Sequence, residues 1–366
     1  MGVPYAAQLA SKQERCVAAL AGFVAEGAWL APFTGPESAF RNKAKLVVGG
    51  TAGAVTLGIL DGSGRGVDLR DCGLYEPGLA EAIPVLAAFL DEVGIAPYDV
   101  PGRRGELKHV IVTHSPDDEL TVRFVLRTPH EVARLRKHLP RLRSDLPRIA
   151  VASANLQPVH MAILEGDTEI VLTDRAVLPM RVNDITLGLR PNSFFQTNTG
   201  VAAALYRQAR EWVEALSPTS LWDLYCGVGG FALHCMGGPG APRDVLGVET
   251  SPEAVESARS SLDRLAPSED SSITFVVGDA TTMGASGRVP PDLVIVNPPR
   301  RGLGAELAAW LNDSPARHVI YSSCNVDSLA KDLAVLSSYS PRAARLFDMF
   351  PQTAHHEVMV LLSRTS

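Results

Sequence analysis

Short apolar runs alternate with segments of helical period between residues 199 and 362, and this alternation constrains the fold more than any other feature of the sequence. Runs such as LVIV (293–296) and HVIY (318–321) are apolar at nearly every position, which is typical of strands buried on both faces. With helices between them, they predict a mostly parallel, doubly wound α/β sheet from about residue 185 onward. Ligands bind such sheets at the carboxyl ends of the strands, so the residues that follow each strand are candidates for function.

The chain before residue 180 has a different texture, and its length leaves room for a second domain. A helix is expected within the first 27 residues, followed by β-prone runs with glycine-rich turns such as DGSGRG (61–66) and by helical blocks at 78–93 and 131–143. We therefore expect three parts. These are an N-terminal helical segment (1–30), a smaller α+β domain (31–180) and a C-terminal α/β domain (181–366).

Composition excludes several classes of protein. The chain is 46% apolar and 20% charged, which suits a buried core and does not suit a disordered or collagen-like chain. No apolar run approaches the roughly 18 to 20 residues that span a bilayer, and the N-terminus lacks the basic-then-apolar pattern of a secretory signal. We therefore predict a soluble cytoplasmic protein without a membrane partner. The five cysteines are too few and too irregularly spaced for a disulfide framework, and they contain no C-x-x-C pair.

Positive charge is concentrated locally, although the net charge is −6. Between residues 123 and 148 there are eight Lys or Arg against two Asp or Glu, and we call this segment the basic stripe. FRNKAK (40–45) carries Arg41, Lys43 and Lys45 at alternating positions of a β-prone segment, which places them on one face of the expected strand. A solvated strand edge and a contact to phosphate are both consistent with this alternation.

The first strand of the C-terminal sheet leads into DLYCGVGGF (223–231). There Gly227 and Gly229 allow a tight turn and a close approach of the backbone to a ligand at a helix N-terminus. Twenty residues beyond Gly229 the second strand ends in Glu249, a spacing at which a carboxylate binds ribose hydroxyls. The pair indicates an adenosyl or a dinucleotide ligand, since Gly227, Gly229 and Ala232 also satisfy G-x-G-x-x-A. A turn that serves only packing is a third interpretation.

The next two strands also end in polar residues. Asp279 follows the third strand, where it is expected either to contact an adenine amino group or to cap the following helix. The fourth strand ends in VNPPRRG (296–302), whose two prolines hold a rigid extended turn that directs Asn297 toward the space above the sheet. Arg300 and Arg301 follow and are able to bind phosphate. An ordinary proline-rich loop explains the same residues.

The fifth strand ends in HVIYSSCN (318–325), which puts Cys324 at the carboxyl edge of the sheet, immediately before a helix. A helix N-terminus favours a thiolate, so Cys324 is a candidate nucleophile. MFPQTAHHEV (349–358) brings His355, His356 and Glu357 to the start of the last strand, where a buried carboxylate is costly unless it has a function. These three residues are too close in sequence to converge on one metal ion without a sharp turn, so metal binding is the less favoured interpretation.

RPNSFFQTN (190–198) precedes the first helix of the C-terminal domain. Gln196 and Asn198 are expected either to cap that helix or to hydrogen-bond a ligand at its start. Phe194 and Phe195 are most simply explained as core residues.

Together these motifs resemble a known family. DLYCGVGGF, VNPPRRG, IYSSCN (320–325) and LFDMFPQTAHHEV (346–358), in that order and joined to FRNKAK and SFFQTN, are similar to the RNA uracil-C5 methyltransferases that use S-adenosylmethionine. NLQPVHMAILEG (155–166), FRNKAK and LFDMFP most resemble the uracil-747-specific 23S rRNA type, which lacks the N-terminal oligonucleotide-binding barrel of its siblings. The resemblance covers the chain from about residue 30 to the end. It implies a Rossmann-like class I methyltransferase sheet and 23S rRNA, rather than DNA, as the partner.

The resemblance also implies roles for individual residues. It makes Cys324 the nucleophile and Glu357 the general base. The resemblance assigns contacts with the methyl donor to Gln196, Tyr225, Glu249 and Asn297. The spacing of the strand ends adds Gly227, Gly229 and Asp279 to this set. RNA is then the ligand expected for Arg41, Lys43, Lys45, Arg300 and Arg301.

Methylation of uracil at carbon-5 requires a cysteine nucleophile and a carboxylate base. Carbon-5 of uracil is a poor nucleophile, and addition of a thiolate to carbon-6 converts the ring into an enolate whose carbon-5 can take the methyl group. Glu357 would then remove the extra proton so that the cysteine is eliminated, a step that suits a carboxylate of raised pKa in a dry pocket. S-adenosylmethionine supplies the methyl group, so methyl transfer itself requires no metal.

The sequence departs from the family in its cysteines. RNA-specific members commonly hold a [4Fe-4S] cluster with four cysteines, three near the N-terminus and one farther on. DLRDCGLYEP (68–77) matches the later position and gives Cys72, but no trio precedes it, and Cys16 lies in a helical stretch that does not match. Because one thiolate cannot hold a cluster, we expect either a chain that begins downstream of the true start, which we favour, or a lost cluster.

Other functions are consistent with parts of the sequence. A nicotinamide-dependent oxidoreductase would use the G-x-G-x-x-A turn and Glu249, but it leaves Cys324, Glu357 and the NPPR turn without roles. A non-catalytic RNA-binding protein would use the basic stripe and a vestigial adenosyl pocket, which the presence of both Cys324 and Glu357 argues against. Methylation of an adenine amino group expects an aromatic residue after the prolines, where this chain has Arg300.

Overall fold

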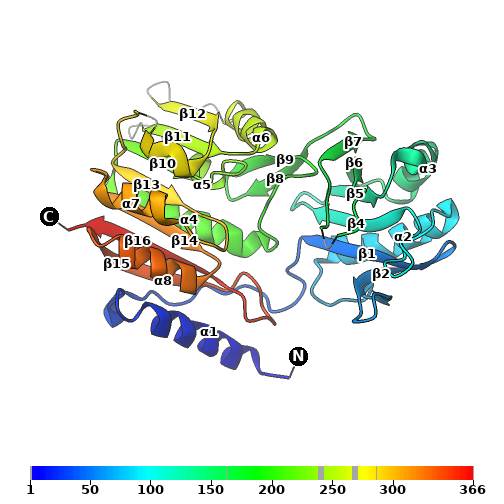
Figure 1. The fold of residues 1–366 in the computed structure, drawn as a ribbon, viewed down its shortest axis with the longest axis horizontal. Helices are drawn as coiled ribbons and strands as arrows, with labels where there is room; N and C mark the ends of the chain where they lie inside the picture. Colours follow the sequence, from blue (N-terminus) through cyan, green and yellow to red (C-terminus); the bar gives the residue numbers. More distant parts are fainter. Residues whose placement is uncertain (1, 162, 238–242, 266–270, 286, 366) are drawn as a thin grey trace. The chain divides into compact units, whose positions relative to one another are not determined.

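The computed structural model describes residues 2–161, 163–237, 243–265, 271–285 and 287–365. The chain folds into two compact units. The larger unit contains Met1–Glu37, Val182–Gly188 and Ser193–Ser366, and the smaller unit contains Ser38–Arg181 and Leu189–Asn192 (Figure 1). The N-terminal residues therefore belong to the same unit as the C-terminal sheet.

The larger unit is built on a seven-stranded sheet in the order β12-β11-β10-β13-β14-β16-β15. Its strands are β10 (Ser220–Leu224), β11 (Asp244–Glu249), β12 (Ser272–Val277), β13 (Leu293–Val296), β14 (His318–Ser323), β15 (Tyr339–Phe347) and β16 (Glu357–Arg364). β10 to β14 are parallel, and β16 and β15 add an antiparallel edge. The strand order reverses between β10 and β13, so the predicted doubly wound α/β sheet is confirmed.

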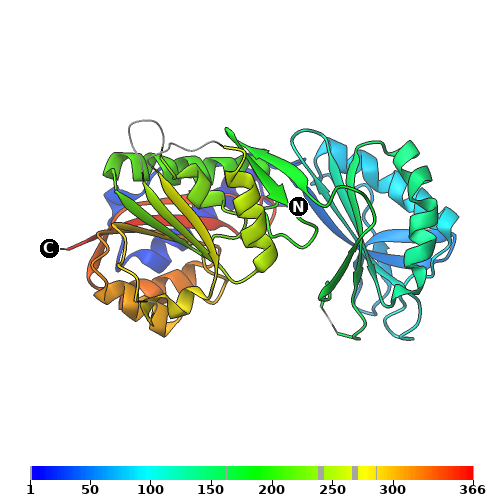
Figure 2. The same cartoon turned by 90° about the horizontal axis from the view of Figure 1, so that it is seen from above.

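Helices cover both faces of this sheet, with α7 and α8 on one side and α4 on the other (Figure 2). The elements between and before the strands are α4 (Thr199–Leu216), α5 (Gly230–His234), α6 (Pro252–Leu262), η3 (Ala280–Ala285), α7 (Ala305–Asp313) and α8 (Val326–Val335). On the α7 and α8 side, alternate strand residues such as Trp222 and Leu224 pack against Leu307 and Leu329 of the helices. No helix in the described part of the chain is long and apolar enough to cross a membrane.

The N-terminal segment packs onto the same side. It forms α1 (Tyr5–Leu20) and the short η1 (Glu26–Ala28). Cys16 and Leu20 of α1 are fully buried and join the core beneath α7 and α8. The chain then runs beside β15, because the backbone N–H groups of Leu30 and Phe33 donate to the carbonyls of Ala344 and Leu346.

The smaller unit is an α+β sandwich of one sheet and two helices. Its sheet has the order β3-β2-β1-β4-β5-β6-β7, and only β5 and β6 are parallel neighbours. The elements are β1 (Lys43–Thr51), β2 (Ala54–Leu60), β3 (Gly66–Asp68), α2 (Pro77–Val93), β4 (Leu107–His114), β5 (Leu120–Leu126), η2 (Pro129–Glu131), α3 (Val132–Asp145), β6 (Ile149–Leu156) and β7 (Thr168–Val171). Both helices pack on one face of the sheet, where the core of this unit lies.

A short hairpin joins the two units along the chain. It consists of β8 (Leu178–Val182) and β9 (Ile185–Leu189), with Asn183 of its turn in the left-handed region at φ 55°. The sequence analysis did not predict this hairpin, because each strand has only five residues.

Candidate active site

The parallel strands of the larger unit bring the residues that follow them to one edge of the sheet. Around this edge lie the ends of five strands, with Tyr225 after β10, Glu249 ending β11, Asp279 after β12, Asn297 after β13 and Cys324 after β14. β16 runs antiparallel to β14 and begins at the same edge, with Val358 opposite Ser323. Glu357 therefore lies beside Cys324, and the topology brings the two residues expected to react into one place.

Glu357 is the first residue of β16 and is only 2% exposed. The hydroxyl of Ser322 on β14 donates to its Oε1 at 2.8 Å. Burial raises the pKa of the Glu357 carboxyl to about 7, and the Ser322 hydrogen bond opposes that rise. A carboxyl with this pKa can take up and release a proton near neutral pH, as a general base requires. The hydrogen bond between Ser322 and this carboxyl was not foreseen from the sequence.

Cys324 is half-buried in the turn between β14 and α8. Burial, and then the charge of Glu357, raise the pKa of its thiol, whereas Arg300 lowers it. Desolvation therefore opposes the effect expected of the helix N-terminus on this thiol. A backbone N–H group at the start of α8 also has a local hydrogen-bond partner, since the side chain of Asn325 accepts from the backbone N–H of Asp327.

Arg300 is the cation of this edge. It is exposed, and its Nη2 lies 3.0 Å from Nδ1 of His355. The side-chain amide of Asn325 donates to the Arg300 carbonyl at 3.0 Å, which joins the turn after β13 to the turn after β14. His355 was considered above only as a metal ligand, and its contact with Arg300 was not foreseen. Hydrogen bonds from Thr281, and then the charge of the exposed Arg301, lower the pKa of the Asp279 carboxyl.

Gly227 and Gly229 of DLYCGVGGF have different surroundings. At Gly229, with φ 86°, an added Cβ would come within 3.2 Å of Ala258, Leu233 and Phe275, so this glycine permits close packing of α5. At Gly227, with φ 54°, an added Cβ would meet nothing within 4 Å. The Gly227 N–H donates to Oε2 of Glu249 at 3.1 Å. The packing interpretation thus suits Gly229, whereas Gly227 borders open space beside a carboxylate.

Tyr225 precedes this turn with φ 69°, a left-handed conformation that is rare for a bulky residue. Its backbone N–H and that of Cys226 both donate to the carbonyl of Val248, which holds the strained turn against β11. Strain of this kind is typical of functional sites.

Asp223 is a site residue that the sequence analysis missed. It is fully buried in β10, and its Oδ2 accepts from the backbone N–H of Ala232 at 2.9 Å. Its Oδ1 has no hydrogen-bond partner within the described ranges, and burial raises its pKa to about 7. An acidic residue inside an apolar strand, four positions before Gly227, was the signal available in the sequence.

The remaining predicted residues of this unit also have defined places. Asp279 accepts from the backbone N–H of Thr281 at 2.9 Å, so the capping interpretation is observed for it. Asn297 is half-buried and Gln196 is buried. Asn198 caps α4, as its side chain accepts from Val201 N–H.

The two phenylalanines before α4 differ. Phe195 is in the core at 4% exposure, as predicted, but the prediction was wrong for Phe194, which is 72% exposed. Successive side chains of an extended segment point to opposite sides, so only one of the two reaches the core.

The predicted RNA contacts of the smaller unit lie on and before β1. Lys43 and Lys45 alternate with the buried Ala44, so they share the face of the sheet opposite its core, whereas Arg41 precedes the strand. Lys45 Nζ forms an ion pair with Glu165 at 3.2 Å. Burial lowers the pKa of Lys43 to about 8.

The basic stripe is less exposed than its composition indicates. Arg123 is only 2% exposed on β5, an inner strand of the sheet, where it pairs with Glu165 and Glu169, so including it in an exposed stripe was wrong. Arg136 and Lys137 of α3 are exposed, and no ion pair to either is found in the described residues.

The cysteines give no metal centre. Cys72 is half-buried and packs against the core of the smaller unit. Cys16, in the larger unit, has its Sγ 3.1 Å from Nε2 of His356. Among the side chains the structure describes, no three from His, Cys, Asp and Glu come together as a metal site, so these residues do not fit an iron-sulfur cluster.

Comparison with known proteins identifies the family. Residues 290–365 match the family model described as tRNA (Uracil-5-)-methyltransferase. Over 361 residues the chain is 47% identical to the 23S rRNA (uracil(747)-C(5))-methyltransferase RlmC of Yersinia pestis, covering 98% of this chain and 94% of the relative. The chain belongs to the RNA uracil-C5 methyltransferase family. The protein of the same name from Halothiobacillus neapolitanus is 48% identical over 362 residues, covering 99% of this chain and 94% of the relative.

A solved structure supports the same family assignment. The tRNA (uracil-54, C5)-methyltransferase of Pyrococcus abyssi, in complex with S-adenosyl-L-homocysteine, shares 25% sequence identity with this uracil-C5 methyltransferase family member. The TM-score is 0.79, and the match covers 98% of this chain and 84% of the other. The resemblance drawn from the motifs, and the class I methyltransferase fold that it implied, are confirmed.

Proposed function

We propose that this family member transfers a methyl group from S-adenosylmethionine to carbon-5 of a specific uridine in 23S rRNA. The observation that carries the proposal is the pairing of Cys324 with the buried Glu357 at the edge of the sheet that also holds the glycine turn. Ribosomal RNA is favoured over transfer RNA because the relatives that match nearly the whole chain are named for 23S rRNA.

The residues around the glycine turn fit the methyl donor. S-adenosylmethionine supplies a methyl group on a positively charged sulfur. Gly227 leaves open space beside Glu249, whose carboxylate is suited to ribose hydroxyls. The unpartnered Oδ1 of Asp223 offers an acceptor for a positively charged group or a bound water. Four further residues complete the proposed donor site, namely Gln196, Tyr225, Asp279 and Asn297.

The proposed reaction has two covalent stages. The Cys324 thiol loses its proton, and the thiolate forms a bond from Sγ to carbon-6 of uracil, which moves the ring electrons to carbon-5 and the neighbouring carbonyl oxygen. Carbon-5 then takes the methyl group, and S-adenosylhomocysteine is the leaving group. Glu357 accepts the proton from carbon-5, the double bond to carbon-6 re-forms, and the bond to Sγ breaks. One methyl group is transferred and one proton is released overall.

The charges near Cys324 matter to the first stage. Because burial and Glu357 raise the pKa of the thiol, forming the thiolate is costly in this environment. Arg300 is the group whose charge favours the thiolate, and it also stands where a substrate phosphate would be bound.

We assign RNA recognition to both parts of the chain. The α+β domain (31–180) contributes Arg41, Lys43 and Lys45, and the catalytic domain (181–366) contributes Arg300 and Arg301. These cations are suited to phosphate contacts, which fix the position of the RNA rather than read its sequence.

Methyl transfer to unmodified 23S rRNA tests the proposal. The wild-type chain should transfer radiolabelled methyl groups to carbon-5 of uridine. Cys324→Ala should transfer none while it binds S-adenosylmethionine as the wild type does. Cys235→Ala, at the opposite end of α5 from the glycine turn, is the matched control and should stay active. Transfer by Cys324→Ala near the wild-type rate, or a wild-type chain that binds rRNA without methylating it, would overturn the proposal.

A further inference from the structure

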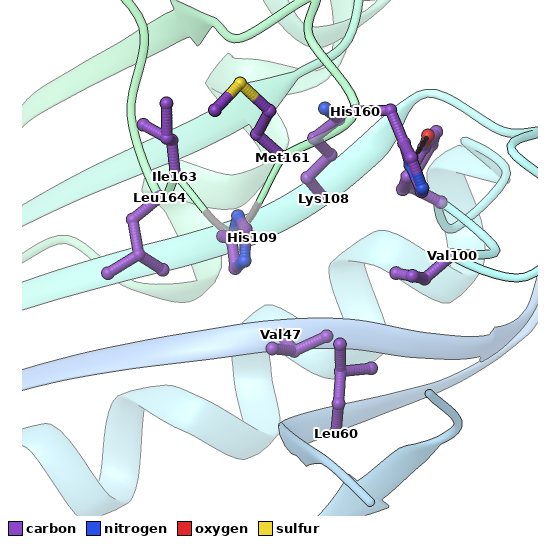
Figure 3. A pocket seen from close by; sticks show the side chains of 10 residues that line it. Val47, Leu60, Val100, Lys108, His109, His160, Met161, Ile163 and Leu164 are labelled. Atoms are coloured by element: carbon purple, nitrogen blue, oxygen red, sulfur yellow. Dashed lines mark hydrogen bonds between the residues drawn. The ribbon is translucent and has the colours of Figure 1, made fainter. Parts of the chain in front are cut away.

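The smaller unit contains a cavity of about 430 Å³ that the proposed reaction does not use. Val47 of β1 and Leu60 of β2 form one side, and Met161, Ile163 and Leu164 after β6 form the other (Figure 3). Met161 is 66% exposed and Ile163 is 45% exposed. Large apolar side chains gathered around an open cavity are typical of a binding site.

A few polar groups line the same cavity. Lys108 is almost fully buried, and its Nζ lies 4.6 Å from the centre of the Tyr98 ring, a cation–π contact. Its ammonium group also donates to the carbonyl of Val159 at 2.8 Å. The hydroxyl of Tyr98 lies 2.9 Å from Nδ1 of His160, and the two rings are 6.2 Å apart. The cavity is therefore lined by two aromatic rings beside a fixed positive charge.

His109 is the group in the cavity that lacks a partner. Its Nδ1 is buried, and no hydrogen bond to it is found within the described residues. Burial and the charge of Lys108 lower the pKa of His109 to about 4, so the imidazole is neutral at physiological pH. A neutral imidazole in an apolar wall can exchange a hydrogen bond with the edge of a ligand. A buried polar nitrogen without a partner is unusual and points to a group that is bound there.

The chemistry of the lining selects the kind of ligand. Apolar and aromatic walls suit a flat ring, whereas an isolated phosphate or metal ion would gain nothing from them. Burying the polar groups of Lys108 and His109 is costly if the ligand is a pure hydrocarbon. A nucleobase is flat and weakly polar on its faces and carries hydrogen-bonding groups on its edge. Proteins recognise unpaired bases of RNA by stacking them on such rings and bonding their edges.

Positive charge leads to this cavity along one strand. Lys43, Lys45 and Val47 occupy alternate positions of β1 and share one face, so the two lysines are followed on that face by a residue of the cavity wall. Arg103 and Arg104, shortly after the lining residue Val100, are exposed. A strand of RNA is the ligand that combines a base for the cavity with phosphates for these cations.

We propose that this cavity binds one unpaired base of the RNA substrate, with Tyr98 and His160 against the ring and His109 on its edge. Lys43 and Lys45 then contact the adjoining phosphates. The inference rests on the proposed function, since it assigns the RNA substrate a further point of attachment on the smaller unit.

The test compares variants of the full chain in RNA affinity and in methyl transfer to unmodified 23S rRNA. Tyr98→Ala and His109→Ala should each raise KM for the rRNA by about tenfold and leave kcat within about twofold, as loss of a stacked base predicts. Met161→Ala, on an exposed side chain, should act in the same direction without endangering the fold. Val67→Ala on β3, also an exposed apolar residue of this unit, is the matched control and should change neither constant.

Photo-crosslinking gives a direct readout. Wild-type protein irradiated with 4-thiouridine-substituted 23S rRNA should yield nucleotide-bearing peptides that contain Tyr98 or Met161. Unchanged KM values, crosslinks confined to other surfaces, or a lower Tm of the variants without weaker RNA binding would each overturn the inference. If the wild type methylates rRNA and only the cavity variants fail to respond, the proposed function stands and the cavity assignment fails. If the wild type methylates no RNA, the proposed function fails independently of the cavity.

Discussion

Among single residues, the buried carboxyls of Asp223 and Glu357 have the clearest consequences. Burial raises both pKa values to about 7. A carboxyl whose pKa is higher in the folded than in the unfolded chain binds its proton more tightly when folded. The folded state therefore loses stability as the pH rises from the unfolded pKa, near 4.5 for Glu357, to the folded value near 7.

Glu357→Gln should accordingly stabilise the protein in a pH-dependent way. The free energy of unfolding should exceed that of the wild type by about 2 kcal/mol more at pH 8 than at pH 5, because the neutral amide avoids a buried charge. Denaturant unfolding at the two pH values measures this difference. Glu306→Gln, on an exposed position of α7, controls for the substitution itself. An equal effect of Glu357→Gln at both pH values would contradict the burial argument.

Arg300 should set the pH at which methyl transfer becomes fast. The thiolate is the reactive form and its pKa is raised, so the rate of a single turnover rises with pH. Because Arg300 lowers that pKa, Arg300→Ala should move the midpoint of the rise upward, and Arg300→Lys should move it less. Saturating rRNA separates this effect from weaker binding. A midpoint that does not move would remove Arg300 from the activation of Cys324.

At the scale of elements, α1 holds the loop that leads into Glu357. Lys12 of α1 and Asp348 form a buried ion pair at 2.6 Å, with Asp348 fully buried. Cys16, one helical turn later, contacts His356, the residue before Glu357. The start of β16 is thus fixed by a helix more than 300 residues away in sequence.

Breaking this ion pair should loosen the loop. Lys12→Met leaves the Asp348 carboxylate buried without its cation, which should cost about 3 kcal/mol of unfolding free energy. The hydroxyl of Tyr5, which still donates to Asp348 at 2.7 Å, keeps the cost near the lower end of the usual range. Hydrogen exchange should accelerate in residues 348–356.

Another residue of the same helix provides the control. Arg15 pairs with Asp327 at 2.9 Å, and both side chains are more than half exposed. Arg15→Gln should therefore cost under about 1 kcal/mol. If Lys12→Met cost no more than Arg15→Gln, α1 would have no part in holding the loop.

For the whole molecule, the salt dependence of RNA affinity reports how many Lys and Arg side chains contact RNA phosphates. Arg136 and Lys137 are exposed on α3, whereas Arg141 on the same helix pairs with Asp145 at 2.8 Å. The double variant Arg136→Gln and Lys137→Gln should reduce the slope of log affinity against log salt by about 1 to 2. Arg141→Gln, the control, should change it less. An unchanged slope in the double variant would mean that Arg136 and Lys137 stay in solvent and do not contact the RNA.

The sequence predicted most of the catalytic fold because its pattern is regular. Strands β10, β11, β13 and β14 are largely buried and therefore consist of apolar runs, whereas the edge strand β12 is partly exposed. The residues after these strands were expected at one edge of the sheet. The position of Glu357 beside Cys324 also depends on the antiparallel pairing of β14 with β16. The order of the motifs along the chain does not determine this pairing. In the smaller unit the helices and main strands were predicted, whereas the β8–β9 hairpin was missed.

The errors concern residues whose environment is set by distant neighbours. The count of charged residues placed Arg123 among the surface cations. It lies instead in the inner strand β5, where Glu165 and Glu169, more than 40 residues along the chain, neutralise its charge. Asp223 was interpreted as part of a glycine motif, although its burial makes it a separate feature. Local pattern determines none of these properties.

Covalent attachment of RNA to Cys324 is the most direct test of the proposed reaction, in which Cys324 bonds to the uracil ring and Glu357 allows its release. Glu357→Gln protein would be incubated with S-adenosylmethionine and unmodified 23S rRNA, denatured, digested with nuclease and protease, and analysed by mass spectrometry. We expect a peptide containing Cys324 that carries a methylated uridine nucleotide, because elimination stalls without the base. A digest without any nucleotide-bearing peptide, or with the nucleotide attached at another residue, would contradict it.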